Sequence, residues 1–344
     1  RLLLERGDRV LEVEEHLVGA EAGGFAEHLL VGAGRGVTGP AGQVAGAFRH
    51  GPDASADYGR TVARDLPTET LHEIADGVFV WLLPGGETGV ANAGVIAEAD
   101  GLTIVDTLMV RSQWAPFAAA VAELDQPVRR CVLTHAHIDH VGGTRAFPAA
   151  AIYATPAASW VLDQPMPLDA YKSFMAAFAD EFDDLAEVGT RPVTHEVDGA
   201  ARLTERVELL TASGHTSGDL MVLVEDADVC FAGDLCFFGV TPLAFQGDPA
   251  AWADTLDVLV DLAATVVPGH GPVGGEPEIR DLQAYLRACV TAGGDPARIG
   301  PGPWDAWIDR AERDPINVER AALLAQGRDE MPPAMQRAIG LGEP

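Results

Sequence analysis

The sequence predicts an α/β fold in which two β-sheets pack together and helices cover their outer faces. Short strand-like runs cluster twice along the chain, between residues 77 and 155 and between residues 201 and 270. Helix-like stretches stand between the runs of each cluster, and turn signals such as "PGGETG" separate neighbouring strands. Two strand clusters with helices interspersed are typical of a layered sandwich.

In the first cluster, the expected strands are apolar runs bounded by glycine, proline or aspartate. They cover residues 77–83, 93–98, 102–108, 129–135 and 151–155. Helices are expected at 112–124, directly after Gly142, and in an insert at roughly 156–187.

The second cluster repeats this pattern. Strands are expected within 201–213, 220–234 and 264–270, with a helix at 249–263. These elements divide the chain into three parts: a flexible or loosely ordered N-terminal extension (1–68), a catalytic domain (69–275) and a C-terminal helical segment (276–344). The helical segment is broken into pieces by proline and glycine.

Charge and composition limit the classes of partner. The chain has 344 residues, of which 23 are basic and 52 acidic, so the net charge is −29. A field of this sign repels nucleic acid and anionic membrane surfaces, which argues against nuclease and RNA-processing functions. A small-molecule substrate is the expected partner, with no nucleic acid and no membrane, and a homodimer is left open.

The cysteines and the apolar runs indicate the compartment. The four cysteines form no CxxC pair, which favours reduced structural thiols. No apolar run reaches the roughly 18 residues needed to span a bilayer, and no apolar signal-peptide core follows Arg1. We therefore expect a cytoplasmic protein.

The stretch "THAHIDHVGG" (134–143) contains three histidines and an aspartate within six residues. His135 and His137 stand two apart at the end of an apolar strand, where side chains two apart point to the same side. Where the backbone turns, Asp139 and His140 can face a second point nearby. Imidazole nitrogens and carboxylate oxygens converging on one point are what zinc requires.

Three later strand ends show the same pattern of an apolar run, a small residue and then a metal-ligating type. They place His215 in "LLTASGHTSGD", Asp234 in "DVCFAGDLCF" and His270 in "TVVPGHGP". Each residue alone is better explained as an ordinary loop residue. Together they would fall on one edge of a sheet sandwich, and this convergence predicts a metal site.

With this set of motifs, the chain resembles the metallo-β-lactamase fold hydrolases over about residues 70–275. The resemblance implies a four-layer αββα sandwich that carries two metals on one edge, here with an N-terminal extension and a C-terminal helical tail. It implies that His135, His137 and His215 bind the first metal. It further implies that Asp139, His140 and His270 bind the second metal and that Asp234 bridges the two.

The resemblance also implies supporting residues and a chemistry. Asp106, in "IVDT", would brace the histidine-rich loop from behind, together with Thr134. Two divalent ions, expected to be Zn²⁺ with iron or manganese as alternatives, would supply a bridging hydroxide that attacks a carbonyl carbon. Asp139 would be catalytic, orienting the hydroxide or moving its proton.

Differences from individual branches of the family narrow the range of substrate classes. The segment after Asp234 reads "LCFFGVTPLAFQGD", without the cysteine-glycine-arginine segment of glyoxalase II and persulfide dioxygenases. Lactamases of the dinuclear histidine-rich type commonly lack the bridging aspartate, so Asp234 argues against that branch. The segment is more similar to cyclases and thioesterases of aromatic polyketide biosynthesis and to hydrolases around them, at the level of motifs.

Aromatic residues suggest an apolar substrate pocket. The insert at 156–187 has an aromatic series at helical spacing, which favours a packed helix face; a cap over the site is the alternative, and the two can coexist. The side chains expected to line the pocket are Trp81, Trp160, Phe174, Phe178 and Phe238. An apolar lining would favour an apolar or aromatic acyl group.

The leading hypothesis is a dinuclear zinc hydrolase, a thioesterase or lactonase type of enzyme, that cleaves an ester, lactone or thioester with an apolar acyl part. The alternatives are a glyoxalase II-like hydrolase of glutathione thioesters and an iron-dependent sulfur dioxygenase that uses the same ligands. A non-catalytic protein that kept the fold is a further class, which seven intact ligand positions argue against.

Overall fold

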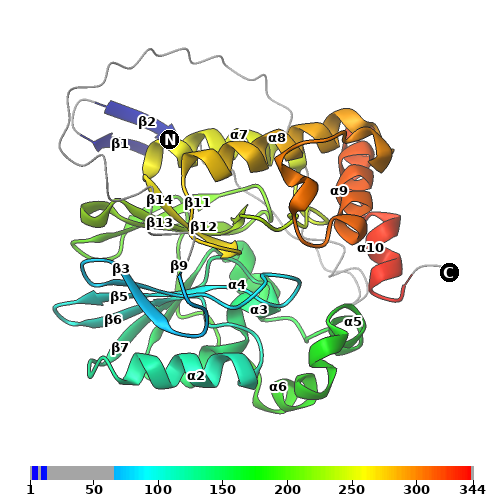
Figure 1. Ribbon diagram of the computed structural model, residues 1–344. Helices are drawn as coiled ribbons and strands as arrows, with labels where there is room; N and C mark the ends of the chain where they lie inside the picture. The colour runs from blue at the N-terminus through cyan, green and yellow to red at the C-terminus, as the bar shows by residue number, and fades with distance from the viewer. Residues whose placement is uncertain (1, 7–8, 14–65, 342–344) are drawn as a thin grey trace.

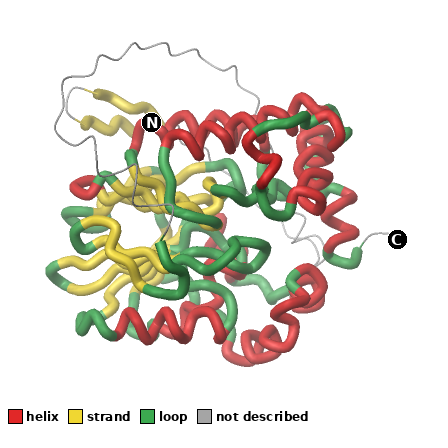
Figure 2. Tube along the Cα trace, in the orientation of Figure 1, coloured by secondary structure: helices red, strands yellow, loops and turns green. Residues whose placement is uncertain are grey.

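The computed structural model describes residues 2–6, 9–13 and 66–341. Most of the predicted N-terminal extension (1–68) lies outside the described residues. Within it, β1 (Leu2–Arg6) and β2 (Arg9–Val13) pair antiparallel, a hairpin that the sequence did not predict. The remainder is a sandwich of two sheets between helical layers (Figures 1 and 2), as expected.

The first sheet has seven strands whose spatial order is their order along the chain. The strands are β3 (Leu71–Ala75), β4 (Val78–Trp81), β5 (Ala93–Glu98), β6 (Gly101–Val105), β7 (Val128–Val132), β8 (Ala151–Ala154) and β9 (His195–Glu196). Pairing is antiparallel from β3 to β6 and parallel from β6 to β9. The carboxyl ends of β6 and β7 therefore lie at the same edge.

The second sheet has five strands, again in chain order. They are β10 (Ala200–Arg202), β11 (Val207–Ala212), β12 (Asp219–Val224), β13 (Val229–Phe237) and β14 (Thr265–His270). Pairing is antiparallel except between β13 and β14, which run parallel. As in the first sheet, a parallel pair brings two carboxyl ends to one edge.

Three apolar cores hold the layers together. Between the sheets, β-branched residues such as Val80, Val105 and Val222 meet face to face and are fully buried or nearly so. The first sheet buries its outer face under α2 (Arg111–Ala122), and Phe117 of this helix is completely buried. The second sheet lies under α7 (Pro249–Leu262) and α8 (Glu276–Ala292), as Figure 1 shows.

The C-terminal segment continues the outer helical layer and then turns toward the insert. After α8 come α9 (Arg310–Ala325) and α10 (Pro333–Ala338). Met335 of α10 belongs to a small apolar cluster with Leu243, and Phe174 of the insert packs against this cluster. Figure 1 accordingly shows α10 beside α5 (Leu168–Phe174), so the C-terminal segment packs against the insert.

Several expected elements differ in detail. The insert is helical but broken into α4 (Pro156–Leu162), α5, a 3₁₀ helix (Ala176–Glu181) and α6 (Phe182–Val188). Met175, with φ −115° and ψ 54°, ends α5, so the expected continuous helical series at 174, 178 and 182 does not form. The helix after Gly142 is a short 3₁₀ helix, Gly142–Ala146. The expected strands at 201–213 and 220–234 are each two strands joined by a turn.

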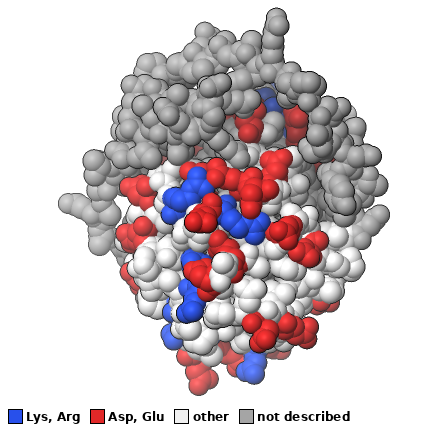
Figure 3. Space-filling model, turned by 90° about the vertical axis from the view of Figure 1, so that its left-hand side faces the viewer, with Lys and Arg blue, Asp and Glu red and all other residues white. Residues whose placement is uncertain are grey.

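Other features of the described chain bear on the sequence expectations. All four cysteines are buried and free, and burial raises the pKa of Cys131 and of Cys230 to about 12. Within the described residues, no helix is both long and apolar enough to cross a bilayer. On the face shown in Figure 3, the acidic side chains lie among the basic ones.

Candidate metal centre

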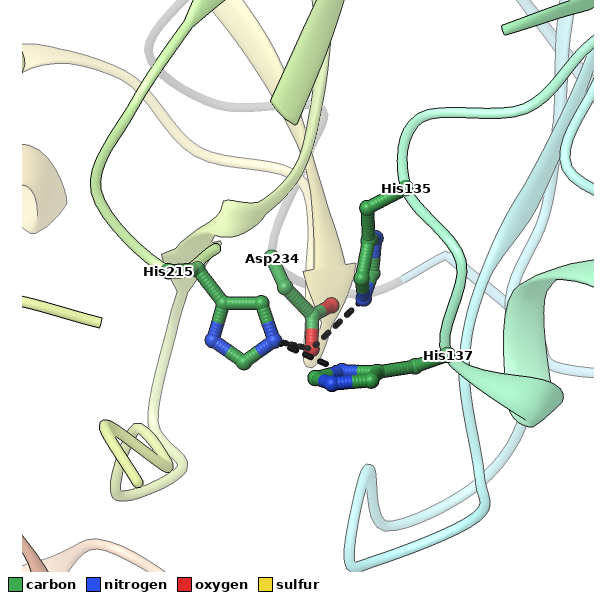
Figure 4. A group of neighbouring side chains, drawn as sticks. All are labelled: His135, His137, His215 and Asp234. Atoms are coloured by element: carbon green, nitrogen blue, oxygen red, sulfur yellow. Dashed lines mark hydrogen bonds and ion pairs between the residues drawn. The ribbon is translucent and has the colours of Figure 1, made fainter. Parts of the chain in front are cut away.

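The expected ligands converge at one edge of the sandwich, where loops follow the carboxyl ends of strands from both sheets. His135, His137, His215 and Asp234 offer ligand atoms that all lie within 4.8 Å of one another (Figure 4). Asp139, His140 and His270 form a second group by the same measure. The structure thus brings all seven residues into two adjacent clusters.

Each cluster combines segments that are far apart in the sequence. His135 and His137 lie between β7 and the short helix α3 (Ile138–Val141), which carries Asp139 and His140. His215 follows β11, and His270 is the last residue of β14. Asp234 differs from expectation because it lies inside β13, which continues to Phe237 instead of ending before the aspartate.

A distortion in β13 brings Asp234 to the centre. The register with β14 shifts on both sides of Gly233, whose φ of +52° favours glycine. A Cβ at Gly233 would lie 2.4 Å from the Thr134 hydroxyl, and a Cβ at Gly269 would lie 1.9 Å from Asp234 Oδ1. A side chain at Gly233 would therefore collide with the loop after β7, and one at Gly269 would collide with the Asp234 carboxylate in the neighbouring strand.

The carboxylate of Asp234 stands between the two clusters. Its Oδ2 lies 3.4 Å from His215 Nε2 and 3.8 Å from His135 Nε2. Its Oδ1 lies 3.1 Å from His140 Nε2 and 3.6 Å from His270 Nε2. Each oxygen therefore faces one cluster, so a single carboxylate contacts both.

Burial and charge make the centre suitable for cations. Burial lowers the pKa of His135 and His137, and lowers that of His215 to about 3, so these imidazoles are neutral and can donate lone pairs. Although burial alone would raise the pKa of Asp234, the neighbouring histidines, His270 first, hold it well below its usual range.

Two further observations fit a bound cation. Although burial alone would lower the pKa of His140, the carboxylates around it, Asp234 first, raise it well above its usual value, so negative charge is in excess here. His135 Nε2 is buried and makes no hydrogen bond within the described part of the chain. A metal ion between the clusters would neutralise the carboxylates and give this nitrogen a partner.

Hydrogen bonds on the side away from the clusters fix the orientation of three of the imidazole rings. The nitrogens that face away from the clusters contact fixed acceptors: His135 Nδ1 is 3.1 Å from Thr134 Oγ1, His140 Nδ1 is 2.8 Å from Asp106 Oδ2, and His270 Nδ1 is 3.0 Å from the Gly86 carbonyl. Such contacts select the tautomer that leaves the other nitrogen free for a metal.

Asp106 connects the first sheet to the histidine-rich loop. Its carboxylate accepts hydrogen bonds from the Thr134 backbone N–H at 2.8 Å and from the Thr134 hydroxyl at 2.7 Å, in addition to its contact with His140. The residue is buried, with φ of +57°. It therefore occupies the bracing position expected from the sequence.

We expect Asp106→Asn to lower the free energy of unfolding by about 1–3 kcal/mol, because an amide cannot accept all three hydrogen bonds and leaves buried donors unsatisfied. Asparagine tolerates the left-handed backbone, so the change isolates the loss of the carboxylate. Urea unfolding in the presence of a chelator measures the effect apart from metal binding. Asp125→Asn is the matched control, since Asp125 has φ of +51° and is exposed. Equal stability of the two variants would contradict this role.

A residue that the sequence reasoning missed holds the loop of His215. Asp219 accepts hydrogen bonds from the backbone N–H groups of His215 and Thr216 and from the Thr216 hydroxyl, at 2.6–3.1 Å. Burial raises the pKa of this carboxyl to about 7. The available signal was the aspartate at the end of "HTSGD", four residues after the ligand, a spacing typical of a side chain that closes a tight turn.

A cavity of about 190 Å³ opens beside the two clusters. Ligand residues from both, including His137, Asp139 and His270, form one end of it. The walls are mainly apolar and come from three segments: the insert, the loop after β13, and the C-terminal helices. Their lining residues include Trp160, Met166, Phe174, Leu243, Phe245, Met335 and Ile339.

Only two of the five predicted pocket aromatics, Trp160 and Phe174, line this cavity. Trp81 is instead buried beneath α2, with its ring 5.7 Å from that of Phe117. Phe238 is buried in the core under α8, and Phe178 packs on the edge of the core under α2. These three side chains lie outside this cavity, because apolar residues near a site in sequence are often buried in the core instead.

The comparisons with known proteins agree with this architecture. The family model of the metallo-beta-lactamase superfamily matches residues 86–318, more than half of the chain and well beyond residue 275. VMB-1 is 16% identical with a TM-score of 0.51, covering 64% of this chain and 99% of that one. The DIM-1 metallo-beta-lactamase is 16% identical with a TM-score of 0.50, covering 65% of this chain and 99% of that one.

The FIM-1 metallo-beta-lactamase of Pseudomonas aeruginosa, in its mono-zinc form, is 22% identical with a TM-score of 0.49 and covers 65% of this chain and 96% of that one. At such identities the solved structures show the fold alone. The match to the family model over residues 86–318 is the finding that assigns the chain to a family. The protein belongs to the metallo-beta-lactamase superfamily and is a metal-dependent hydrolase of that fold.

Proposed function

We propose that the protein is a dinuclear zinc hydrolase that cleaves an ester, lactone or thioester with an apolar acyl part. The observation that carries this proposal is the position of Asp234, whose two carboxylate oxygens face different clusters of ligands. The apolar cavity beside those clusters supplies the second half of the argument.

The two ligand sets suit two divalent ions. His135, His137 and His215 with one Asp234 oxygen would hold the first ion, and Asp139, His140 and His270 with the other oxygen would hold the second. When bound, such ions supply an ionised water near neutral pH and stabilise negative charge on a carbonyl oxygen. Neutral imidazoles and carboxylates favour zinc, with iron and manganese as alternatives.

Asp139 is suited to moving a proton at the cavity end. Its side chain is 14% exposed and lines the cavity, and its Oδ2 lies 3.3 Å from His270 Nε2. Although burial would raise the pKa of this carboxyl, the nearby His140 and His270 hold it well below its usual range. Asp139 is therefore ionised and can accept a hydrogen bond from an attacking water or orient it.

The cavity lining favours an apolar acyl group. Aromatic and aliphatic side chains dominate the walls, and Arg313 is the only cationic side chain among the described residues that line it. Glutathione carries two carboxylates, which this lining does not match. A panel of aryl esters, lactones, acyl thioesters, lactams and S-lactoylglutathione, run with metal analysis and oxygen uptake, tests the proposal.

We expect turnover of esters, lactones or thioesters that carry apolar acyl groups, with zinc bound and no oxygen uptake. Activity confined to S-lactoylglutathione would overturn the acyl preference. Stoichiometric iron with substrate-dependent oxygen uptake would overturn the hydrolase mechanism in favour of a sulfur dioxygenase.

Met335→Ala is expected to shift selectivity toward longer acyl groups, because it removes an apolar side chain from the cavity wall. One extra or missing methylene in an apolar pocket is worth roughly 10–200-fold in kcat/KM, so a shift of about tenfold in the ratio for long over short acyl groups is expected. Acyl esters of increasing length measure it. Val290→Ala, at an exposed site on α8, is the control. An unchanged ratio would exclude α10 from the substrate pocket.

A further inference from the structure

His137 occupies a distinctive position among the histidines of the first cluster. Its Nδ1 faces the cluster, 2.9 Å from His215 Nε2, while its Nε2 lies 2.7 Å from Gln246 Oε1. Its ring stacks on that of Phe245, with centroids 5.5 Å apart and planes at 15°. An amide oxygen can only accept a hydrogen bond, so Nε2 carries the proton and Nδ1 presents a lone pair to the cluster.

Phe245 and Gln246 lie in a loop, residues 241–247, which contains neither helix nor strand. One face of α9 holds this loop through Arg313, Asn317 and Arg320, which are spaced by four and three residues and so lie on the same side of the helix. Backbone groups along the loop bond to these side chains in order. Arg313 Nη1 donates to the Thr241 carbonyl. Asn317 makes two bonds: its Nδ2 donates to the Pro242 carbonyl at 2.8 Å, and its Oδ1 accepts from the Ala244 N–H at 2.8 Å. Arg320 Nε donates to the Gly247 carbonyl at 2.8 Å.

The three side chains are themselves fixed. Asn317 is fully buried, and Arg313 and Arg320 are 3% and 4% exposed. Arg313 pairs with Asp309 at 2.9 Å, and Arg320 pairs with Asp329 at 2.7 Å, so both guanidinium groups have a carboxylate partner. Buried side chains that bond to a loop's backbone set its position more firmly than the loop's own sequence can.

We propose that Gln246 is a positioning residue that selects the tautomer of His137 and aims its Nδ1 at the first metal, and that α9 places Gln246 through Arg313, Asn317 and Arg320. The inference rests on the proposed metal-binding role of His137. It gives α9 a part in building the metal site, although this helix lies about 180 residues after His135 in the sequence.

The test compares Gln246→Met with Gln246→Glu in the full chain. Methionine keeps the length of the side chain but cannot accept the hydrogen bond from His137 Nε2–H. A carboxylate accepts this hydrogen bond as the amide oxygen does. We expect Gln246→Met to weaken the affinity for one of the two zinc ions by about 10–100-fold, the usual effect of losing such a partner. Gln246→Glu should bind zinc as tightly as the wild type or more tightly. Titration of zinc against a chromogenic chelator measures both affinities without reference to turnover.

A second pair of variants tests the role of α9. Arg320→Met should lower the affinity for the same zinc ion, because it removes the hydrogen bond that holds the backbone beside Gln246. Arg328→Met is the matched control because Arg328 is exposed and its side chain pairs with Glu330. Circular dichroism checks that each variant is folded. If Arg320→Met does not fold, the two Gln246 variants still test the role of Gln246 in zinc binding.

The outcomes separate this inference from the proposed function. A wild-type chain that binds no zinc would refute the metal site itself. A wild-type chain that binds zinc, with Gln246→Met binding equally well, would overturn the role of Gln246 alone. Equal weakening in Gln246→Met and Gln246→Glu would also overturn it, because a packing change and not the hydrogen bond would then be responsible.

Discussion

Replacing Asp139 with alanine is expected to reduce kcat/KM by at least about 10²–10⁴-fold while the protein remains folded. The substitution removes a carboxylate that lines the cavity and faces His270 at 3.3 Å. It takes away both a ligand of the proposed second ion and the group placed to orient or deprotonate the attacking water. The effect should appear in kcat, because the lost interactions act on the reacting atoms more than on the acyl group.

The control for this variant is Asp169→Ala, which removes an exposed aspartate from the insert. Steady-state kinetics on the best substrate of the panel and far-ultraviolet circular dichroism are measured for both. Wild-type kcat in Asp139→Ala would remove Asp139 from the mechanism. Loss of the folded spectrum would call for Asp139→Asn, which keeps the shape of the side chain.

Asp234→Asn is expected to have the widest effect, because the same side chain serves both clusters. Its Oδ2 faces His215 and His135, and its Oδ1 faces His140 and His270. An amide keeps one acceptor oxygen and turns an N–H group toward the other cluster. We expect zinc affinity to fall more than the 10–100-fold that accompanies loss of a residue bonded only to a ligand, with turnover lost in parallel.

Zinc titration and turnover of Asp234→Asn are compared with those of Asp228→Asn. Asp228 precedes β13 and its Oδ1 accepts from the Ala264 N–H at 3.2 Å, outside the two clusters. If Asp234→Asn bound two zinc ions with wild-type affinity, the carboxylate would not be a bridge. If it lost only one ion, Asp234 would belong to a single cluster.

The residues of the two clusters could be predicted from the sequence because most of them follow a local rule. His135 and His137 follow an apolar strand of the first sheet, and His270 ends an apolar strand of the second sheet. Parallel pairing brings strand ends together within each sheet, and the packing of the two sheets makes the edge common. Asp106 was identified from the family resemblance, and it directly follows β6. The position of Asp234 inside β13 was not predicted, because the bulge at Gly233 depends on contact with Thr134 of the other sheet.

The cavity was less predictable because its walls come from segments that meet only in the folded chain. Met335 and Ile339 line it, and no local pattern links them to "THAHIDH" some 200 residues earlier. Trp81 was assigned to the pocket from its position in the sequence, but the core under α2 buries it. Gln246 contacts His137 across 109 positions, and that contact depends on α9.

The most direct test of the central claim is the metal content of the full-length protein after saturation with zinc and removal of excess metal. The bridging geometry of Asp234 predicts two zinc ions per chain, both removed by a strong chelator together with activity, and both restored with it. A saturated protein that holds one ion or none, yet retains full hydrolytic activity, would contradict the proposed dinuclear centre.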